Sequence, residues 1–213
     1  MSHPENVVHS TRVPSGFNLF PPPGWDTIPL QHGTKEALQR IVRKSVSQLP
    51  AGFPKDDIPK ARLQLMTELK QTVRKARNSN GLTLYLPVEP MHGMLIPASF
   101  IASEPLAAPT GNVEPEAVLV DLVRDAENAS ARDLDGTAAV RTLWKLPANP
   151  EKGVSVPSWR VQYTVPIPNS TPPRWLTFSF STLVAPDMDM EFTETLVELF
   201  DAVMTTFRWS YAC

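Results

Sequence analysis

Residues 174–183 read RWLTFSFSTL and show the clearest alternation of side chains in the whole chain. In an extended segment, Leu176, Phe178 and Phe180 would project to one side, and threonine and serine side chains stand between them. A period of two predicts a β-strand with one buried face and one polar face. We therefore expect a sheet that keeps its core on one side of this strand.

Other segments of the sequence extend this sheet and place helices around it. Strand patterns occur over residues 26–30, 82–89, 94–103, 137–146 and 158–166. Apolar residues at helical spacing predict helices over 34–49, 58–78, 115–126 and 191–208. Strands in the middle, with helices before, between and after them, indicate an α+β fold in which helices cover an antiparallel sheet.

The composition is that of a folded chain with stiff loops. Of its 213 residues 42% are hydrophobic, which excludes a mostly disordered protein. The 23 prolines, against 9 glycines, fall mainly in loops and at the ends of strands. We expect a flexible tail over residues 1–16 and a single domain over 17–213, with an inserted helical pair over 34–78.

Cysteine content and hydropathy indicate in which cellular compartment the chain is expected. Cys213 is the one cysteine, so the chain can form no internal disulfide and no metal site of several thiolates. The first 20 residues lack the apolar stretch of a secretory signal, and no later run has the length of a membrane span. We expect a cytoplasmic protein, and export by a route that reads no such signal stays open.

The signatures of common enzyme sites are missing from the sequence. It has no glycine-rich phosphate loop, no Gly-x-Ser-x-Gly elbow and no His-Glu-x-x-His motif. The run Asp133-Leu-Asp-Gly136 is typical of a turn, since a calcium loop there would place Thr142 where a bidentate glutamate is needed. His92 has the chemistry of a base or a ligand, but no partner stands at a fixed spacing from it. We predict no catalytic residue, no metal and no cofactor.

Charge is distributed unevenly, although the formal net charge is only -2. Residues 34–77 carry 11 basic and 4 acidic side chains, and the rest of the chain carries 9 basic and 18 acidic ones. Lys70, Arg74 and Arg77 follow one another at i, i+4 and i+7 and form one ridge on the second predicted helix. The ridge is a solvated face, a face neutralised by the acidic last helix, or a site for an anionic partner. Nucleic acid is not expected, because the pI is near 6.1 and no aromatic residues interleave with these cations.

A tryptophan beside two prolines and an arginine is the other candidate for contact with a partner. Trp175 alternates away from Leu176 and Phe178, which places it on the other face of the sheet. Exposed there next to Arg174, it would be a natural anchor for a protein partner. Burial under the first or second helix explains the pattern equally well.

Three segments together resemble the Mog1/PsbP-like group. They are the run Pro21-Pro-Pro-Gly-Trp25, the paired strands 160–166 and 175–182, and the closing segment 196–209 with its aromatic and basic end. The chain is also similar to actinobacterial proteins of about this length. The resemblance implies an antiparallel sheet closed by a final helix, and the helices over 34–78 depart from the compact pattern of the group. Members of the group bind a small GTPase, a photosynthetic assembly or envelope lipid machinery, so the resemblance implies binding without naming a partner.

The leading hypothesis is a non-enzymatic binding or accessory protein that engages a protein partner through sheet-edge and helix surfaces. The candidate partner-binding residues are Lys70, Arg74, Arg77, Arg174 and Trp175. The alternative is a carrier that holds a small apolar ligand or a lipid in a cleft between the sheet and the helices. An enzyme of an unfamiliar type is the third hypothesis.

Overall fold

The computed structural model describes residues 12–91, 93–94, 96–105, 114–125, 128–149, 151, 155–184 and 189–212. These residues form an antiparallel sheet with the strand order β2-β3-β4-β8-β7-β6-β5, and a small second sheet pairs β1 with β9. The strands are β1 (Gly16–Asn18), β2 (Trp25–Pro29), β3 (Gly81–Pro87), β4 (Ala98–Ser103), β5 (Ala129–Leu134), β6 (Thr137–Leu146), β7 (Ser158–Pro166), β8 (Trp175–Leu183) and β9 (Arg208–Ser210). The helices are α1 (Thr34–Ser47), α2 (Ile58–Asn78), α3 (Pro115–Asp125) and α4 (Met190–Thr205), and a short 3-10 turn (Lys55–Asp57) precedes α2.

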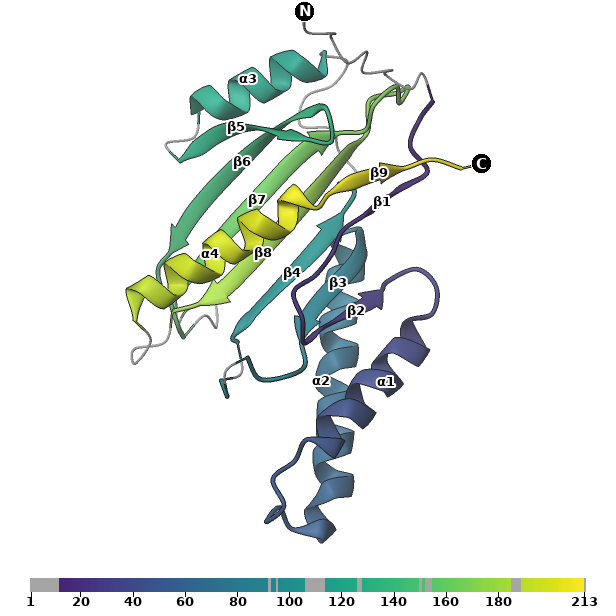
Figure 1. Cartoon of the computed structure of the whole chain (residues 1–213), viewed down its shortest axis with the longest axis vertical. Coiled ribbons are helices and arrows are strands. Elements are labelled where there is room, and N and C mark those ends of the chain that lie inside the picture. The colour runs from purple at the N-terminus through teal and green to yellow at the C-terminus, as the bar shows by residue number, and fades with distance from the viewer. Residues whose placement is uncertain are drawn as a thin grey trace, which may run out of the picture.

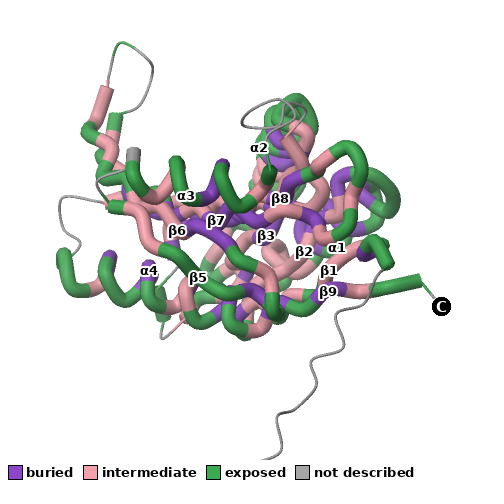
Figure 2. Tube along the Cα trace, turned by 90° about the horizontal axis from the view of Figure 1, so that it is seen from above, coloured by how far each residue is buried: buried purple, intermediate pink, exposed green. Residues whose placement is uncertain are grey.

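The helices lie on both faces of the sheet (Figure 1). Seen from above, α4 lies on one side, and α3 and the α1–α2 pair lie on the other (Figure 2). The far half of the α1–α2 pair extends beyond the edge of the sheet (Figure 1). The predicted fold class, an α+β fold whose antiparallel sheet is covered by helices, is therefore confirmed.

The main core lies between α4 and the sheet and is rich in phenylalanine. The rings of Phe100, Phe178, Phe180, Phe200 and Phe207 are no more than 2% exposed. Strand register places Phe100 opposite Phe180 on neighbouring strands, so the two rings share this face. The alternation of residues 174–183 thus buries the phenylalanines on one face, as the sequence predicts, and the structure shows that α4 covers that face.

A second core joins the α1–α2 pair to the other face of the sheet. Its buried members on the helices are Ala37, Leu38, Ile41, Val42, Leu69, Val73 and Ala76, and those on the strands and their ends include Ile28, Leu30 and Leu84. The pair lies between two neighbouring strands, because β2 leads into α1, and β3 returns from α2 to pair with β2. Its apolar stripes therefore pack on the strands that hold its two ends.

Replacing Gly81 with alanine is expected to lower the free energy of unfolding by about 2 kcal/mol, because the added carbon overpacks the joint between α2 and β3. A Cβ at this position would lie 2.6 Å from Leu30 Cδ1, 2.7 Å from the Ala76 carbonyl oxygen and 2.9 Å from Ile101 Cδ1. Denaturant unfolding of the variant measures the loss. Gly52→Ala is the control, because nothing lies within 4 Å of a Cβ there. Equal stability of the two variants would contradict the packing described for this joint.

Candidate functional site

The α1–α2 pair forms a groove that gathers most of the basic residues singled out from the sequence. Lys70, Arg74 and Arg77 of α2 line it together with Lys35 of α1, and the cavity measures about 740 Å³. We call this hollow the basic groove. The spacing of i, i+4 and i+7 places the three α2 residues on one side of that helix, and the packing of α1 against α2 places Lys35 opposite them.

Arg77 stabilises the end of the basic groove at which α2 ends and α1 begins. Its Nε donates a hydrogen bond to the Leu30 carbonyl at 2.7 Å, and its Nη2 donates to Thr34 Oγ1 at 2.8 Å. Thr34 in turn donates its hydroxyl hydrogen to the Pro29 carbonyl at 2.7 Å. These bonds join the C-terminal end of α2 to the N-terminal end of α1. Arg77 therefore positions the groove as well as contributing charge to it.

The other three cations of the basic groove stay available. Within the described part of the chain, Lys35, Lys70 and Arg74 form no ion pair. All three residues are exposed. The acidic helix α4 does not neutralise the cations of the basic groove. It lies on the other side of the sheet (Figure 2), and its Asp201 pairs with Arg141 of β6.

The floor of the basic groove is apolar. Leu38 and Val73 are buried, and Met66 is half-buried beside them. One carboxylate, Glu36, is also part of the lining, so the cations outnumber the acidic groups. His32 completes the wall from the loop before α1, where no helical periodicity could indicate it.

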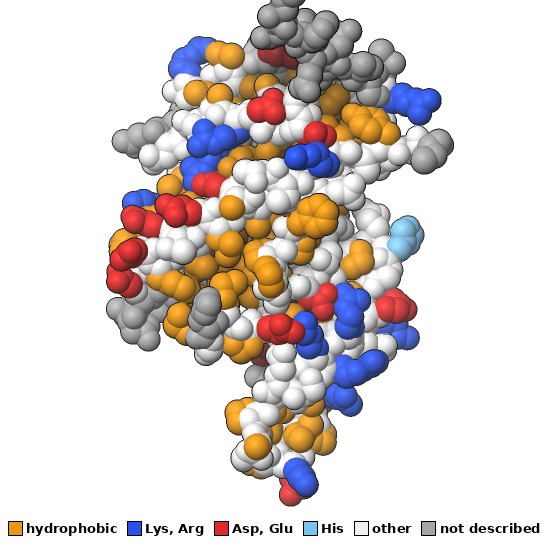
Figure 3. All heavy atoms as spheres, in the orientation of Figure 1, with side chains coloured by type: hydrophobic (Ala, Val, Ile, Leu, Met, Phe, Trp, Pro, Cys, Tyr) orange, Lys and Arg blue, Asp and Glu red, His pale blue; other side chains and the backbone are white. Residues whose placement is uncertain are grey.

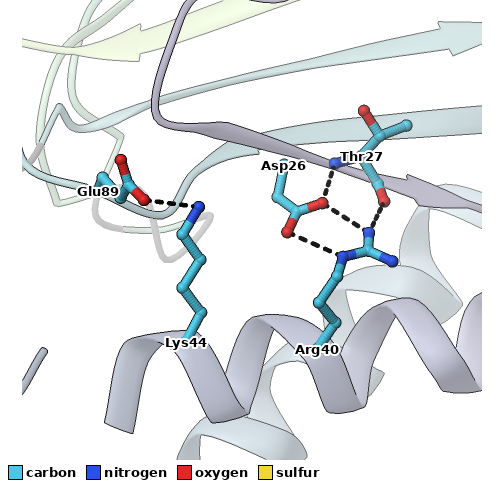
Figure 4. A network of polar contacts seen from close by, with 5 residues as sticks. All are labelled: Asp26, Thr27, Arg40, Lys44 and Glu89. Carbon is cyan, nitrogen blue, oxygen red and sulfur yellow. Dashed lines mark hydrogen bonds and ion pairs between the residues drawn. The ribbon is translucent and has the colours of Figure 1, made fainter. Parts of the chain in front are cut away.

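The remaining cations of α1 that face the sheet are used in holding the helix there (Figure 4). Arg40 donates to both carboxylate oxygens of Asp26, at 2.6 and 3.2 Å, and to the Thr27 carbonyl at 3.1 Å. Lys44 forms an ion pair with Glu89 at 2.7 Å. Partial burial alone would raise the pKa of Asp26, but the hydrogen bonds from Arg40 and Thr27 and the charges of Arg40 and Lys44 lower it below its ordinary value.

The surface view is consistent with a separation between cations that are paired with carboxylates and cations that are not (Figure 3). Lys and Arg side chains gather around α1, where several have acidic side chains beside them, and acidic side chains gather along α4. The bipolar composition of the sequence is thus a bipolar surface. Its basic part includes both neutralised cations, such as Arg40, and the cations that line the basic groove.

Trp175 is not an exposed anchor, and that prediction is wrong. Its side chain is 2% exposed and packs with Val118 and Leu119 of α3 and with Val140 of β6. The predicted face was right, because Trp175 lies opposite the phenylalanines of β8, but α3 covers it rather than α1 or α2. Its neighbour Arg174 donates to both oxygens of Glu104, at 2.5 and 2.8 Å, and lies away from the basic groove.

The remaining features considered in the sequence are His92, metal ligands and membrane-spanning segments. His92 lies outside the described residues. Among the residues that the structure does describe, no group of three His, Cys, Asp or Glu side chains could hold a metal ion. In the same part of the chain, none of the helices combines the length and the apolar character needed to span a bilayer.

Comparison with known proteins finds only distant likeness. No family model and no curated protein matches the chain. LpqN of Mycobacterium tuberculosis, described as involved in cell envelope biogenesis, is 14% identical with a TM-score of 0.47, over 92% of this chain and 86% of LpqN. The Ran-binding protein Mog1p of Saccharomyces cerevisiae is 10% identical with a TM-score of 0.37, over 61% of this chain and 79% of Mog1p. A point mutant of Mog1 is 11% identical with a TM-score of 0.36, over 61% of this chain and 80% of that protein. Mog1 proteins, which belong to the group that the sequence resembles, are thus among the solved structures similar to this chain, at low identity and low TM-score.

Proposed function

We propose that this chain is a non-enzymatic binding protein that holds an acidic segment of a protein partner in the basic groove. One observation carries the proposal: Lys35, Lys70 and Arg74 line the same hollow as Arg77 and form no ion pair with a described residue. Cations that line one hollow give it a positive potential, which favours a bound anion. Carboxylates of a partner would supply it, and each would gain from several cations at once.

The lining favours a protein over a nucleic acid. The described residues of the wall include no Trp, Tyr or Phe on which a base could stack. The floor of Leu38, Met66 and Val73 instead offers apolar contact to side chains that neighbour the carboxylates of a peptide.

The carrier hypothesis receives less support from the packing. Between the sheet and the α1–α2 pair, the described side chains form one buried cluster. Beside α4, the crevice lined by Trp25, Phe100 and Phe200 measures only about 10 Å³. A lipid chain needs far more room than this crevice provides.

Reversing two charges in the basic groove tests the proposal. Lys70→Glu combined with Arg74→Glu is expected to weaken the binding of a fluorescein-labelled polyglutamate peptide by about 100-fold, because two attractions become repulsions. Fluorescence anisotropy measures the affinity. Binding to the unaltered chain should also fall when NaCl rises from about 50 to about 300 mM, because salt screens exposed charges.

Lys75→Glu is the matched control for this experiment. Lys75 lies exposed on α2 but does not line the groove, so one reversal there changes the net charge without altering the site. The proposal fails if the double variant binds the peptide as tightly as the unaltered chain. It also fails if Lys75→Glu weakens binding as much as Lys70→Glu alone, since the attraction would then come from net charge and not from the groove.

A further inference from the structure

The basic groove continues into a second hollow along the same two helices. This hollow measures about 590 Å³, and it shares Gln39 and Met66 with the basic groove. Its other lining residues are Val42, Arg43, Ile58, Pro59, Arg62 and Leu63. We call it the apolar hollow. A single trough thus runs along the α1–α2 pair, with cations at one end and mostly apolar side chains at the other.

The α2 wall of this trough is one continuous stripe of side chains. Each turn of α2 contributes one or two members, which are Ile58, Pro59, Arg62, Leu63, Met66, Lys70, Val73, Arg74, Arg77 and Asn78. Residues 59 to 77 of a helix span about 27 Å at 1.5 Å per residue. The trough therefore has the length of a helix of about 18 residues.

The apolar end of the trough is not covered by the sheet. Leu63 is 69% exposed, and Ile58 and Met66 are only half-buried. This end belongs to the half of the pair that extends beyond the sheet (Figure 1). Arg43 and Arg62 lie beside these apolar side chains, so the rim of the apolar hollow is also basic.

We infer that the trough binds an amphipathic helix of the partner, with acidic residues toward one end of its contact face and large apolar residues toward the other. This inference rests on the proposed function and names the shape of the partner segment. The acidic part would lie against Lys35, Lys70 and Arg74, and the apolar part would cover Leu63. Arg43 and Arg62 would meet further carboxylates along its flanks.

The main-chain hydrogen bonds of the partner segment favour a helix over an extended peptide. In α1 and α2 the main-chain hydrogen bonds are made within each helix, so the trough offers side chains only. An extended peptide would leave its own N–H and C=O groups without partners above Leu63 and Met66, which is costly. A helix satisfies these groups internally and packs into the groove between two helices by ordinary ridge and groove contacts.

Three designed peptides of about 18 residues, the length of the trough, test the inference. The first carries four glutamates in one half of a helical face and two leucines, spaced i, i+4, in the other half, and it is made in both sequence directions. The second has serine in place of both leucines. The third keeps the composition of the first but has two central prolines that break the helix. Affinities are measured by fluorescence anisotropy at about 50 mM NaCl, where screening is weak.

The first peptide, in its better direction, is expected to bind at least about 10-fold more tightly than the other two, because burying leucine on Leu63 adds apolar contact. Leu63→Gln should remove this advantage. Val120→Gln on α3 should leave it unchanged, since Val120 is also exposed, at 58%, but lies outside the trough. Far-ultraviolet circular dichroism checks that both variants keep their helix content.

The outcomes separate this inference from the proposed function. Equal binding of the three peptides, lost in the Lys70→Glu, Arg74→Glu variant, overturns the helix and leaves an acidic partner. Absence of binding by all three overturns both. If none of the leucine advantage appears, and vesicles of phosphatidylglycerol and phosphatidylcholine sediment the unaltered chain but not Leu63→Gln, the occupant is a lipid and the inference is wrong.

Discussion

Replacing Phe200 with alanine is expected to lower the free energy of unfolding by about 4 kcal/mol, near the upper end for a phenylalanine in a close-packed core. The residue is 2% exposed and lies at the centre of the cluster between α4 and the sheet. Its ring stacks on Phe180 at a centroid distance of 4.9 Å and lies 5.6 Å from Phe100 and 5.9 Å from Tyr163. Truncation would therefore remove contacts to three different strands at once.

Denaturant unfolding, with the slope compared to that of the unaltered chain, measures this loss. Phe20→Ala is the control, because that ring is 71% exposed and its removal should cost less than about 1 kcal/mol. A loss of under about 1 kcal/mol for Phe200→Ala would show that α4 does not pack on the sheet in the way described. The variant is also expected to bind the acidic peptide normally while it stays folded, since Phe200 lies outside the basic groove.

Asp201→Ala is expected to cost about 3 kcal/mol, because it leaves the half-buried Arg141 and the buried Tyr163 without their partner. Asp201 accepts hydrogen bonds from Arg141 Nε and Nη2, at 2.7 and 2.8 Å, and from the Tyr163 hydroxyl at 2.7 Å. Burial raises the pKa of Tyr163, and the hydrogen bond to Asp201 raises it further. Burial by itself would lower the pKa of Arg141, but the bonds to Asp201 outweigh it and raise that pKa.

A double-mutant cycle with Arg141→Met separates the lost attraction from the cost of the stranded charge. The double variant is expected to be more stable than Asp201→Ala, because methionine leaves no guanidinium to be desolvated. Glu198→Ala on the exposed side of α4 is the control and should change stability by less than about 0.5 kcal/mol. If Asp201→Ala and Glu198→Ala unfold alike, the contact to Arg141 and Tyr163 does not hold α4.

Periodicity predicts the long elements of this fold well and the short ones poorly. Strand β8 and helices α1, α2 and α4 have apolar residues at regular spacing, and each lies close to its predicted range. Strand β5 is an edge strand in which Ala131, Arg132 and Asp133 are all exposed, so its side chains do not alternate. Strands β1 and β9 have three residues each, which is too short for any period to show.

Only part of the candidate site can be predicted from residue spacing. The ridge of Lys70, Arg74 and Arg77 follows from spacing on one helix, but Lys35 and His32 join it only because α1 packs against α2. The burial of Trp175 follows from where α3 returns over β6, which no local pattern of residues encodes. Sequence periodicity thus locates residues on a face, and the tertiary packing decides what covers that face.

The position of α1 and α2 between two adjacent strands determines which parts of the pair can change in sequence. The chain leaves the sheet after Pro29 and returns at Gly81, and the strands on either side of this excursion pair directly with each other, Pro29 opposite Thr83. The mostly exposed link between the two helices, residues 48–57, can therefore change in length without altering the order of any strand, whereas the buried side chains of both helices belong to the second core. Exposed positions of α1 and α2 can likewise change charge while the buried positions stay the same, so the proposed binding groove is free to vary on an unchanged sheet.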